Sequence, residues 1–402
     1  MKKRVVVLGG SFAGLTAAFD AKRLLRDEAD VIVVSNQPLF TFIPSLIWVV
    51  PGWRRVEDIT FQLAPALAKH GIQTIIANAT HIDPQRNILT TSKGEVPYDY
   101  LVIASGAHLD FAAIPGLGPH GGYTQSVCNL PHALMAQQAW LEYLKDPGPI
   151  VVGAAQGASC FGAGYEFVLN IEYALRRLGL RKRATVTWVT SEPFIGHFGI
   201  SGVKGSEREV GRFFDRYGIE AIPNVAIDQI EANSMRLSNG HELPYKYAMI
   251  IPPFKGIEAI RNSPGVGNAR GWVEVDDHYR HLTYPNIYAA GVSVALTPPV
   301  ATPIPTGVPK TGYMSEVMGR AAAHNIAADI KNHPLKPLSP LDIQAMCLLD
   351  AGDSGMMLLV DKVFGDKRRR EILLPSSLMH LGKLAFESYF IWKTRTGRTY
   401  LP

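Results

Sequence analysis

Three cysteines are the residues best suited to chemistry in this sequence. Cys128, Cys160 and Cys347 are the only cysteines among 402 residues, and a thiolate can attack a sulfur–sulfur bond or an electrophilic ring. So few cysteines in so long a chain cannot form the disulfide framework of a small secreted protein. The alternative is burial as inert apolar side chains, which is common for free cysteine. The sequence around each cysteine decides between these two interpretations.

Cys160 lies in a turn that joins an apolar run to a predicted helix. Residues 149–167 are typical of a buried strand, a glycine-rich turn and a helix. Such a turn normally binds phosphate in an α/β protein, but this one places Gln156 and the Cys160 thiol where phosphate would approach. Glu192, after the next strand, is the one residue that could suit the ribose of NADH. We therefore expect this turn to serve sulfur chemistry and not NAD(P)H.

The N-terminus predicts a nucleotide-binding unit. Residues 4–8 form an apolar run, a glycine-rich turn follows, a helical pattern continues to about residue 26, and a second apolar run covers residues 31–34. This order of strand, turn, helix and strand is the dinucleotide fingerprint in its required context. The middle glycine is replaced by Ser11, and no acidic residue follows the second strand, so Ser35 or Asn36 must bind the ribose. The predicted cofactor-binding residues here are Gly9, Gly10, Ser11, Phe12, Ala13, Gly14, Ser35 and Asn36.

The order of the predicted elements indicates an α/β fold with two Rossmann-like domains, the first of them discontinuous. We expect residues 1–106 and 284–330 to form the first domain. Residues 107–283 form the second domain, with Cys128 in a loop-like segment at 107–135. Residues 331–402 form a C-terminal region that carries Cys347.

Composition and charge exclude several function classes. Apolar residues at 47% and charged residues at 19% are typical of a folded globular protein. A net charge of +5 spread over this length predicts no nucleic-acid binding. The first ten residues lack the long apolar region of a signal peptide, and no window has about 18 apolar residues. We expect a protein that is soluble or lies on a membrane surface, and no metal site.

An aromatic and proline-rich stretch at residues 37–56 has two interpretations. Its side chains, which include Phe40, Phe42 and Trp48, could line a flat cofactor ring. They could equally form a satellite core under a long loop. Pro44 is assigned to the cofactor site on the first interpretation.

Taken together, these motifs resemble those of the sulfide:quinone oxidoreductases, which are related to the flavoprotein subunit of flavocytochrome c sulfide dehydrogenase. The matching segments run from residue 1 to about 393 and include GGSFAG, QSVC, the turn around Cys160, TSEPFIGHFGI, PIPTGVPKTGYM and the DAGDSG that follows Leu349. Residues 98–106 and 284–291 resemble the second and third signatures of flavoproteins with two dinucleotide-binding domains. The resemblance implies FAD in the first domain and oxidation of hydrosulfide by a flavin disulfide-reductase.

The resemblance also assigns roles to the three cysteines. It implies that Cys160 and Cys347 face each other at the flavin ring and form a redox disulfide or polysulfur bridge. Cys128 lies near the methyl edge of the flavin and is attached to it covalently in some members, so both covalent and non-covalent FAD remain open. His132, His197 and Glu166 are the candidates for proton transfer or hydrosulfide positioning.

Further residues are assigned to FAD by the same resemblance. Lys310 is expected near the pyrimidine end of the flavin, where positive charge stabilises the reduced ring. Val292 follows Gly291 where many flavoproteins have Asp, so backbone groups must replace that contact. The remaining predicted cofactor-binding residues are Pro44, Ala77, Gly106, Gly291, Lys310, Thr311 and Gly312.

The C-terminal segment carries apolar and aromatic residues at helical spacing. Residues 374–395 combine them with nearby basic residues, as an interfacial membrane helix does. An ordinary amphipathic helix packed on the core is the alternative. With the resemblance, we expect a monotopic protein of a prokaryotic cytoplasmic membrane. The apolar surface predicts a homo-oligomer, a dimer or a trimer. A lipid quinone is expected to contact Phe386, Tyr389, Phe390 and Lys393.

Three rival functions remain open at the level of sequence. The same sulfide chemistry could deliver electrons to a cytochrome c. A type-II NADH:quinone dehydrogenase would make the cysteines incidental. A flavin-bearing sulfur-binding protein without turnover is the non-enzymatic alternative, which the presence of all three cysteines disfavours.

Overall fold

The first domain is built on a five-stranded parallel sheet. In the computed structural model, which describes residues 2–309, 311–365 and 370–401, the strand order is β19-β9-β1-β2-β5. The strands are β1 (Lys3–Leu8), β2 (Ala29–Ser35), β5 (Gln73–Ile76), β9 (Tyr100–Ile103) and β19 (Ile287–Ala289). Because β19 pairs with β9 after the chain has left and returned, the first domain is discontinuous, as the sequence predicts.

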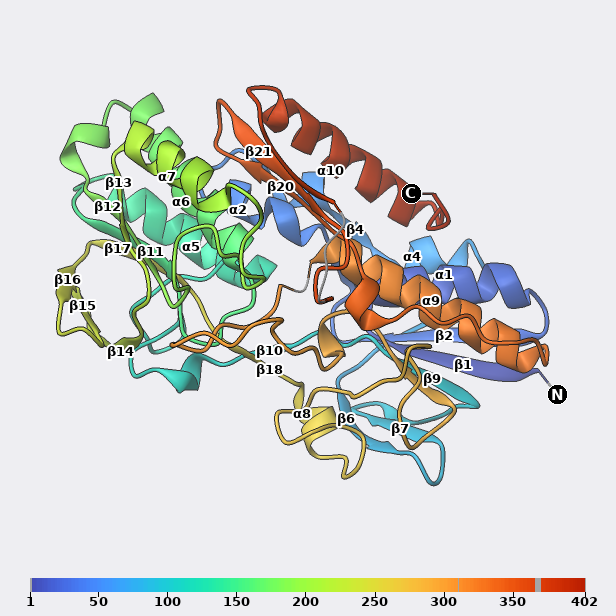
Figure 1. Ribbon diagram of the computed structural model, residues 1–402. Helices are drawn as coiled ribbons and strands as arrows, with labels where there is room; N and C mark the ends of the chain where they lie inside the picture. The colour runs from blue at the N-terminus through green and yellow to red at the C-terminus, as the bar shows by residue number, and fades with distance from the viewer. Residues whose placement is uncertain (1, 310, 366–369, 402) are drawn as a thin grey trace.

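Two helices pack against each other in this domain (Figure 1). They are α1 (Phe12–Leu25) and α9 (Gly312–Ile330). A Cβ built on Gly319 would lie 2.3 Å from the carbonyl oxygen of Ala13, so only glycine allows this approach of the two backbones. The beginning of α9 therefore lies beside the beginning of α1.

The second domain has a four-stranded parallel sheet in the order β13-β12-β11-β17. Three of its strands, β11, β12 and β17, are buried along their whole length, as apolar strands between helices should be. The strands are β11 (Ile150–Ala154), β12 (Val186–Thr190), β13 (Ile219–Ile222) and β17 (Tyr247–Ile251). The helices are α5 (Leu130–Tyr143), α6 (Phe161–Arg177) and α7 (Ser206–Tyr217). Helix α5 begins inside the segment that was expected to be loop-like. The Asn129 side chain caps its start by accepting a hydrogen bond from the His132 amide.

Short elements complete both domains. The first domain carries β3 (Leu39–Thr41), η1 (Ile43–Ser45), α2 (Leu46–Val49), α3 (Val56–Ile59), β4 (Thr60–Gln62), α4 (Leu63–Ala68), β6 (Ala79–Asp83), β7 (Ile88–Thr91), β8 (Gly94–Pro97) and η4 (Gly291–Ser293). The segments between the domains and in the second domain are β10 (His108–Leu109), η2 (Phe111–Ala113), η3 (Arg181–Arg183), β14 (Ile227–Ile230), β15 (Ser234–Leu237), β16 (Glu242–Pro244), β18 (Phe254–Lys255) and α8 (Glu258–Arg261).

Residues 258–283 were expected in the second domain, but they contact the first domain. Ser263 accepts a hydrogen bond from the Ile82 amide at 2.7 Å, and Val273 pairs with Val294. Both partners belong to the first domain. The chain therefore returns to the first domain shortly after β18 and not at residue 284.

The C-terminal region is an antiparallel sheet and a helix. The sheet has the order β20-β21-β22, with β20 (Ala345–Asp350), β21 (Gly355–Val360) and β22 (Glu371–Pro375), and a short helix η5 (Pro340–Asp342) precedes it. Figure 1 shows α10 (Met379–Arg395) beside β20 and β21, extending along one side of the molecule toward α1 and α9. In the described parts of the chain, no helix is both long and apolar enough to cross a bilayer.

The aromatic stretch at residues 37–56 forms core. Phe40, Phe42 and Trp48 are at most 1% exposed, and the rings of Phe40 and Phe42 pack against Phe12. The core interpretation is therefore confirmed for these three residues.

Candidate active site

The structure brings two of the three cysteines to one place. Cys160 is the N-cap of α6, and Cys347 lies on β20, which packs against that helix. A Cβ built on Gly162 would lie 3.4 Å from the Cys347 sulfur, so this sulfur contacts the first turn of α6. The positive end of the helix dipole favours a thiolate at Cys160, the N-cap of α6. The pairing predicted for Cys160 and Cys347 thus has a common location in the fold.

The electrostatics at Cys347 disfavour a free thiolate. Burial raises the pKa of this thiol to about 12, the nearby Glu166 carboxyl raises it further, and Lys383 opposes the rise. Burial likewise raises the pKa of Cys128 to about 11. Reduced Cys347 and Cys128 therefore hold their protons at neutral pH, and any reaction that requires their thiolates needs a proton acceptor.

Glu166 is a suitable proton acceptor beside Cys347. It lies on α6, is 5% exposed, and forms an ion pair with Lys383 of α10. The amide of Asp350 donates a hydrogen bond to its Oε1 at 3.2 Å. Burial raises the pKa of Glu166 to about 7, with Lys383 lowering it and Asp350 raising it. A carboxyl with this pKa can accept and release a proton near neutral pH.

Lys383 and Asp350 extend this network to α10 and α2. Lys383 Nζ donates to the carbonyl oxygen of Pro44 at 3.0 Å and lies 4.5 Å from the centre of the Trp48 ring. Trp48 Nε1 donates to Asp350 Oδ2 at 2.9 Å, and His380 Nδ1 lies 3.0 Å from Asp350 Oδ1. Sequence reasoning treated Lys383 as one of the basic residues near a membrane helix and missed its role here. The only sequence signal was a lysine at helical spacing among apolar residues.

His132 and His197 are both buried, but their surroundings differ. His132 Nε2 lies 3.2 Å from His120 Nε2, and burial, with a smaller effect of His120, lowers its pKa to about 4. His197 Nδ1 accepts a hydrogen bond from the Gly199 amide at 3.2 Å. His132 follows Cys128 at the start of α5, so it remains a proposed proton-transfer residue. His197 likewise remains a proposed residue for proton transfer or hydrosulfide positioning.

The turn at residues 153–160 of the second domain forms hydrogen bonds with other segments of the chain. The amide of Gly157 donates to the Pro305 carbonyl at 2.6 Å, and the amide of Gly307 donates to the Ala158 carbonyl at 2.8 Å. The side chain of Gln156 makes two hydrogen bonds with the backbone of Ile227. The loop at 305–307 thus covers the backbone that would approach a pyrophosphate.

The Glu192 carboxylate accepts hydrogen bonds from three groups of the protein. Its side chain is fully buried and accepts from Tyr165 Oη at 2.7 Å, from Thr190 Oγ1 at 2.8 Å and from the Phe198 amide at 2.6 Å. Burial raises its pKa to about 7 despite these bonds. A carboxyl in this position cannot reach a ribose, which argues against NADH binding at this turn.

The N-terminal turn, in contrast, fits a dinucleotide. Gly9 has φ +126°, and a Cβ there would lie 2.1 Å from the Ala104 carbonyl oxygen. A Cβ on Gly14 would lie 2.0 Å from the Gly9 carbonyl oxygen. Both positions thus require glycine, and the turn leads directly into the 14-residue helix α1, whose N-terminus favours phosphate. Ser35 Oγ is bound to the backbone of Gln37, whereas Asn36 is exposed, so Asn36 is the better ribose ligand.

The other predicted cofactor residues within the described part of the chain contact elements of the first domain. Ala77 hydrogen-bonds to the Ser35 carbonyl, and the Gly106 amide donates to Ser293 Oγ at 3.1 Å. Thr311 caps α9 by accepting from Met314. A Cβ on Gly291 would lie 3.0 Å from Ala13 Cβ, and one on Gly312 would lie 2.7 Å from the Phe12 ring. Lys310 lies outside the described residues.

The predicted quinone residues separate into two groups. Phe390 is buried, with its ring 5.0 Å from Phe12 and 5.8 Å from Phe386. These rings join α10 to the first turn of α1. Lys393, in contrast, is 2% exposed and its Nζ lies 2.7 Å from Glu316 Oε1. This ion pair holds α10 to α9, and the contact of Lys393 with a quinone carbonyl stays a prediction.

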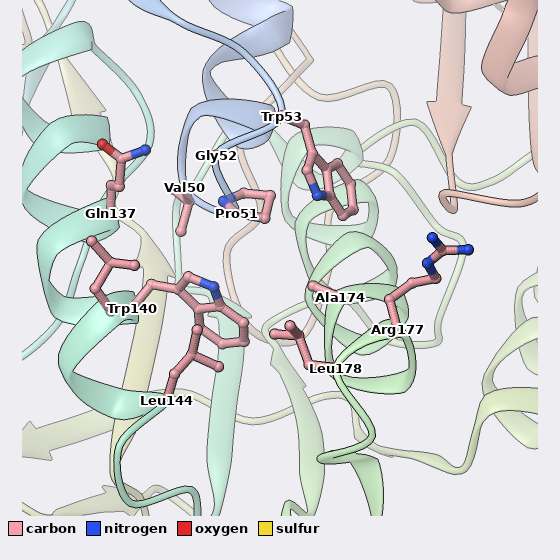
Figure 2. A pocket seen from close by; sticks show the side chains of 11 residues that line it. Val50, Pro51, Gly52, Trp53, Gln137, Trp140, Leu144, Ala174, Arg177 and Leu178 are labelled. Carbon is pink, nitrogen blue, oxygen red and sulfur yellow. The ribbon is translucent and has the colours of Figure 1, made fainter.

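An open pocket of about 210 Å³ lies away from these residues. Figure 2 shows that Trp53, Trp140 and Leu178 line it, together with Arg177. Its walls come from the loop at 50–53, α5 and α6, and its lining includes none of the cysteines. This pocket is therefore separate from the cysteines.

Comparison with known proteins identifies the family. The sequence pattern of the pyridine nucleotide-disulphide oxidoreductases matches residues 3–310. The chain is 41% identical to the sulfide-quinone reductase of Aquifex aeolicus, over 99% of this chain and 92% of that protein. The chain belongs to the sulfide:quinone oxidoreductase family. An X-ray structure of the sulfide:quinone oxidoreductase from Aquifex aeolicus superposes with a TM-score of 0.94, at 40% identity over 98% of this chain and 92% of that one.

A more distant relative is named for NADH dehydrogenation, one of the alternative functions considered from the sequence. An NADH dehydrogenase-like protein of Mycobacterium tuberculosis is 29% identical over 83% of this chain and 82% of its own length. The sulfide:quinone oxidoreductase family is favoured by the higher identity and by the filled second turn. The family resemblance inferred from the motifs is thus confirmed, as are the α/β Rossmann-like fold and an oxidoreductase function.

Proposed function

We propose that this sulfide:quinone oxidoreductase family member oxidises hydrosulfide at Cys160 and Cys347 and transfers two electrons through FAD to a membrane quinone. The single observation that supports this site is the Cys347 sulfur against the first turn of α6, which Cys160 caps. Family membership supports the substrate and the acceptor. The balanced reaction is the conversion of hydrosulfide, quinone and one proton to sulfane sulfur and quinol.

FAD is the cofactor that the family implies, and the N-terminal turn fits it. Gly9, Gly14 and the first turn of α1 would hold its pyrophosphate, and Asn36 its ribose. When bound, FAD supplies a two-electron acceptor for sulfur. Precipitation of the protein in acid distinguishes the two states left open for Cys128, because only covalently attached flavin stays with the protein.

The cysteine chemistry follows from thiol–disulfide exchange. Hydrosulfide attacks one sulfur of a Cys160–Cys347 disulfide, that bond breaks, one cysteine becomes a persulfide and the other a thiolate. The persulfide loses its proton to the Glu166 carboxylate. A new sulfur–sulfur bond then forms between the persulfide and the thiolate and closes a three-sulfur bridge, and the two electrons lost by the sulfurs would be accepted by FAD when it is bound. The three residues thus handle the sulfur atoms and the proton.

The outer face of α10 supports a membrane location. Leu378 and Leu381, at the start of α10, are 64% and 60% exposed, and Trp392 is 43% exposed. The inner face instead carries buried charged residues, which are Lys383, Glu387 and Lys393. The inner face also packs the buried Phe390 on the protein, so the exposed leucines and Trp392 are apolar residues in excess of those that the core needs, as in an interfacial helix. We propose that this face lies in the membrane interface, as a peripheral attachment, and that quinone reaches the aromatic cluster of Phe12, Phe386 and Phe390.

Anaerobic titration of the purified flavoprotein tests this function. Sulfide should bleach the flavin absorbance, NADH should not, and a soluble quinone analogue should restore the absorbance. Bleaching by NADH alone would assign the chain to the NADH dehydrogenases. Reoxidation by cytochrome c and not by quinone would reject the proposed acceptor, and bleaching without turnover would indicate a sulfur-binding protein.

A further inference from the structure

The membrane-side helix α10 contributes a buried cation to the sulfur site. The Lys383 side chain is 3% exposed although its neighbours Leu381 and Gly382 are exposed. Its ammonium contacts the Glu166 carboxylate, the Pro44 carbonyl and the face of Trp48. A buried lysine needs such partners, because an isolated buried charge is costly. The Lys383 side chain therefore points inward, toward Glu166, and not toward the exposed face of α10.

We propose that Lys383 is a positioning residue for sulfide oxidation, which holds Glu166 as a carboxylate beside Cys347 and thereby makes the sulfide half-reaction depend on the docking of α10. This inference rests on the proposed function, because it concerns the proton released from hydrosulfide. It assigns to α10 a task that is separate from membrane attachment and from quinone binding.

The charges around Glu166 show why it needs this cation. Lys383 faces it from α10, whereas β20 contributes the Asp350 carboxyl and the Cys347 thiol. The Asp350 amide donates one hydrogen bond to Glu166. Without Lys383, two buried carboxylates would share this site with no cation between them, so Glu166 would take up a proton. A protonated Glu166 could no longer accept the proton of the persulfide.

A second contact of α10 supports the same coupling. His380 lies on α10 close to Lys383 in sequence, and its Nδ1 is 3.0 Å from Asp350 Oδ1. Trp48 of α2 holds the other oxygen of Asp350. One helix therefore contacts both carboxylates that flank the end of β20, and Cys347 lies on that strand. Undocking α10 would remove both contacts together.

The test is the pH dependence of flavin reduction by sulfide, measured by anaerobic stopped-flow without quinone. In Lys383→Met, the ionisation that precedes flavin reduction should move to higher pH by about one unit or more, so the rate at neutral pH falls about fivefold or more. Lys383→Gln keeps a hydrogen-bond donor without charge and should show the same shift. In a Glu166→Gln background, Lys383→Met should cause no further change in the profile.

Glu387→Gln is the matched control. Glu387 is also buried on α10, where it forms an ion pair with Arg54 at 2.9 Å, and it is not among the charges that act on Glu166. This variant should keep the wild-type profile. If Lys383→Met and Lys383→Gln kept the wild-type profile while quinone reduction slowed, Lys383 would serve the acceptor side and the proposal would be rejected. Failure of sulfide to bleach the wild-type flavin would instead reject the proposed function.

Discussion

The sulfur of Cys347 faces Gly162, because a Cβ built on this glycine would lie 3.4 Å from that sulfur. The contact joins β20 of the C-terminal region to α6 of the second domain. Asp350, at the end of β20, fixes the strand through its amide bond to Glu166 and its carboxylate bonds to Trp48 and His380. The position of the reactive sulfur thus depends on packing between two regions of the chain.

Substitution of Gly162 tests how much room there is between the first turn of α6 and the Cys347 sulfur. A Cβ at 3.4 Å is ordinary contact, so Gly162→Ala should keep most of the sulfide activity and stabilise the helix by about 0.5 to 1 kcal/mol. Gly162→Val adds two methyl groups against the sulfur and should slow flavin reduction by sulfide at least about tenfold. Stopped-flow rates and urea unfolding measure both effects. Equal sulfide rates in the two variants would contradict this location of Cys347.

The three cysteines should differ in their importance. Cys160→Ser and Cys347→Ser should each reduce sulfide-dependent quinone reduction to below about 1% of the wild-type rate, because the bridge needs both sulfurs. Both proteins should remain folded and yellow. Cys128→Ser should reduce the rate less, since its sulfur is outside the bridge. Full activity in either of the first two variants would refute the bridge mechanism.

Most of the first domain could be predicted from sequence because its signals are local. The turn at Gly9 and Gly14 needs glycine for reasons that involve neighbouring strands and helices only, so the fingerprint is visible in the sequence. The same holds for the buried strands around residue 150. The helix that begins at Leu130 was missed because its start depends on the Asn129 cap, which resembles an ordinary loop residue.

The network around Glu166 could not be predicted, because it joins distant segments. Lys383, Asp350 and Trp48 meet Glu166 only after α10, β20 and α2 have packed together. In the sequence, a lysine in an amphipathic pattern is typical of a solvated or membrane-facing position. For the same reason the ion pair of Lys393 with Glu316 of α9 could not be predicted from the sequence.

His132 should make the fold sensitive to acid. Its pKa is lowered to about 4 by burial, so below about pH 6.5 the unfolded chain takes up a proton that the folded protein does not. Stability is therefore unaffected above about pH 6.5 and is lost as pH falls toward 4, by about 2 kcal/mol at pH 5. Urea unfolding at both pH values should show a smaller loss for His132→Gln. An equal loss in the variant would show that His132 does not titrate in this range.

Membrane binding should depend on the leucines at the start of α10. Leu378 and Leu381 are largely exposed, so replacing both with serine should leave the free energy of unfolding almost unchanged. Each leucine that enters a lipid interface from such a position should contribute about 1 kcal/mol. The double variant should therefore bind anionic lipid vesicles about thirtyfold more weakly.

Vesicle flotation measures this binding, and two leucines elsewhere provide the matched control. Leu178 and Leu282 are 53% and 63% exposed but lie outside the C-terminal region, so their double replacement by serine should not change flotation. The exposed Arg395 and Arg398 beside Trp392 predict tighter binding to anionic than to neutral lipid, which salt should weaken. Because flavin reduction by sulfide needs no bilayer, Leu378→Ser with Leu381→Ser should keep that rate while quinone reduction in vesicles falls. Equal flotation of the two double variants would mean that α10 presents its apolar face to another protein surface.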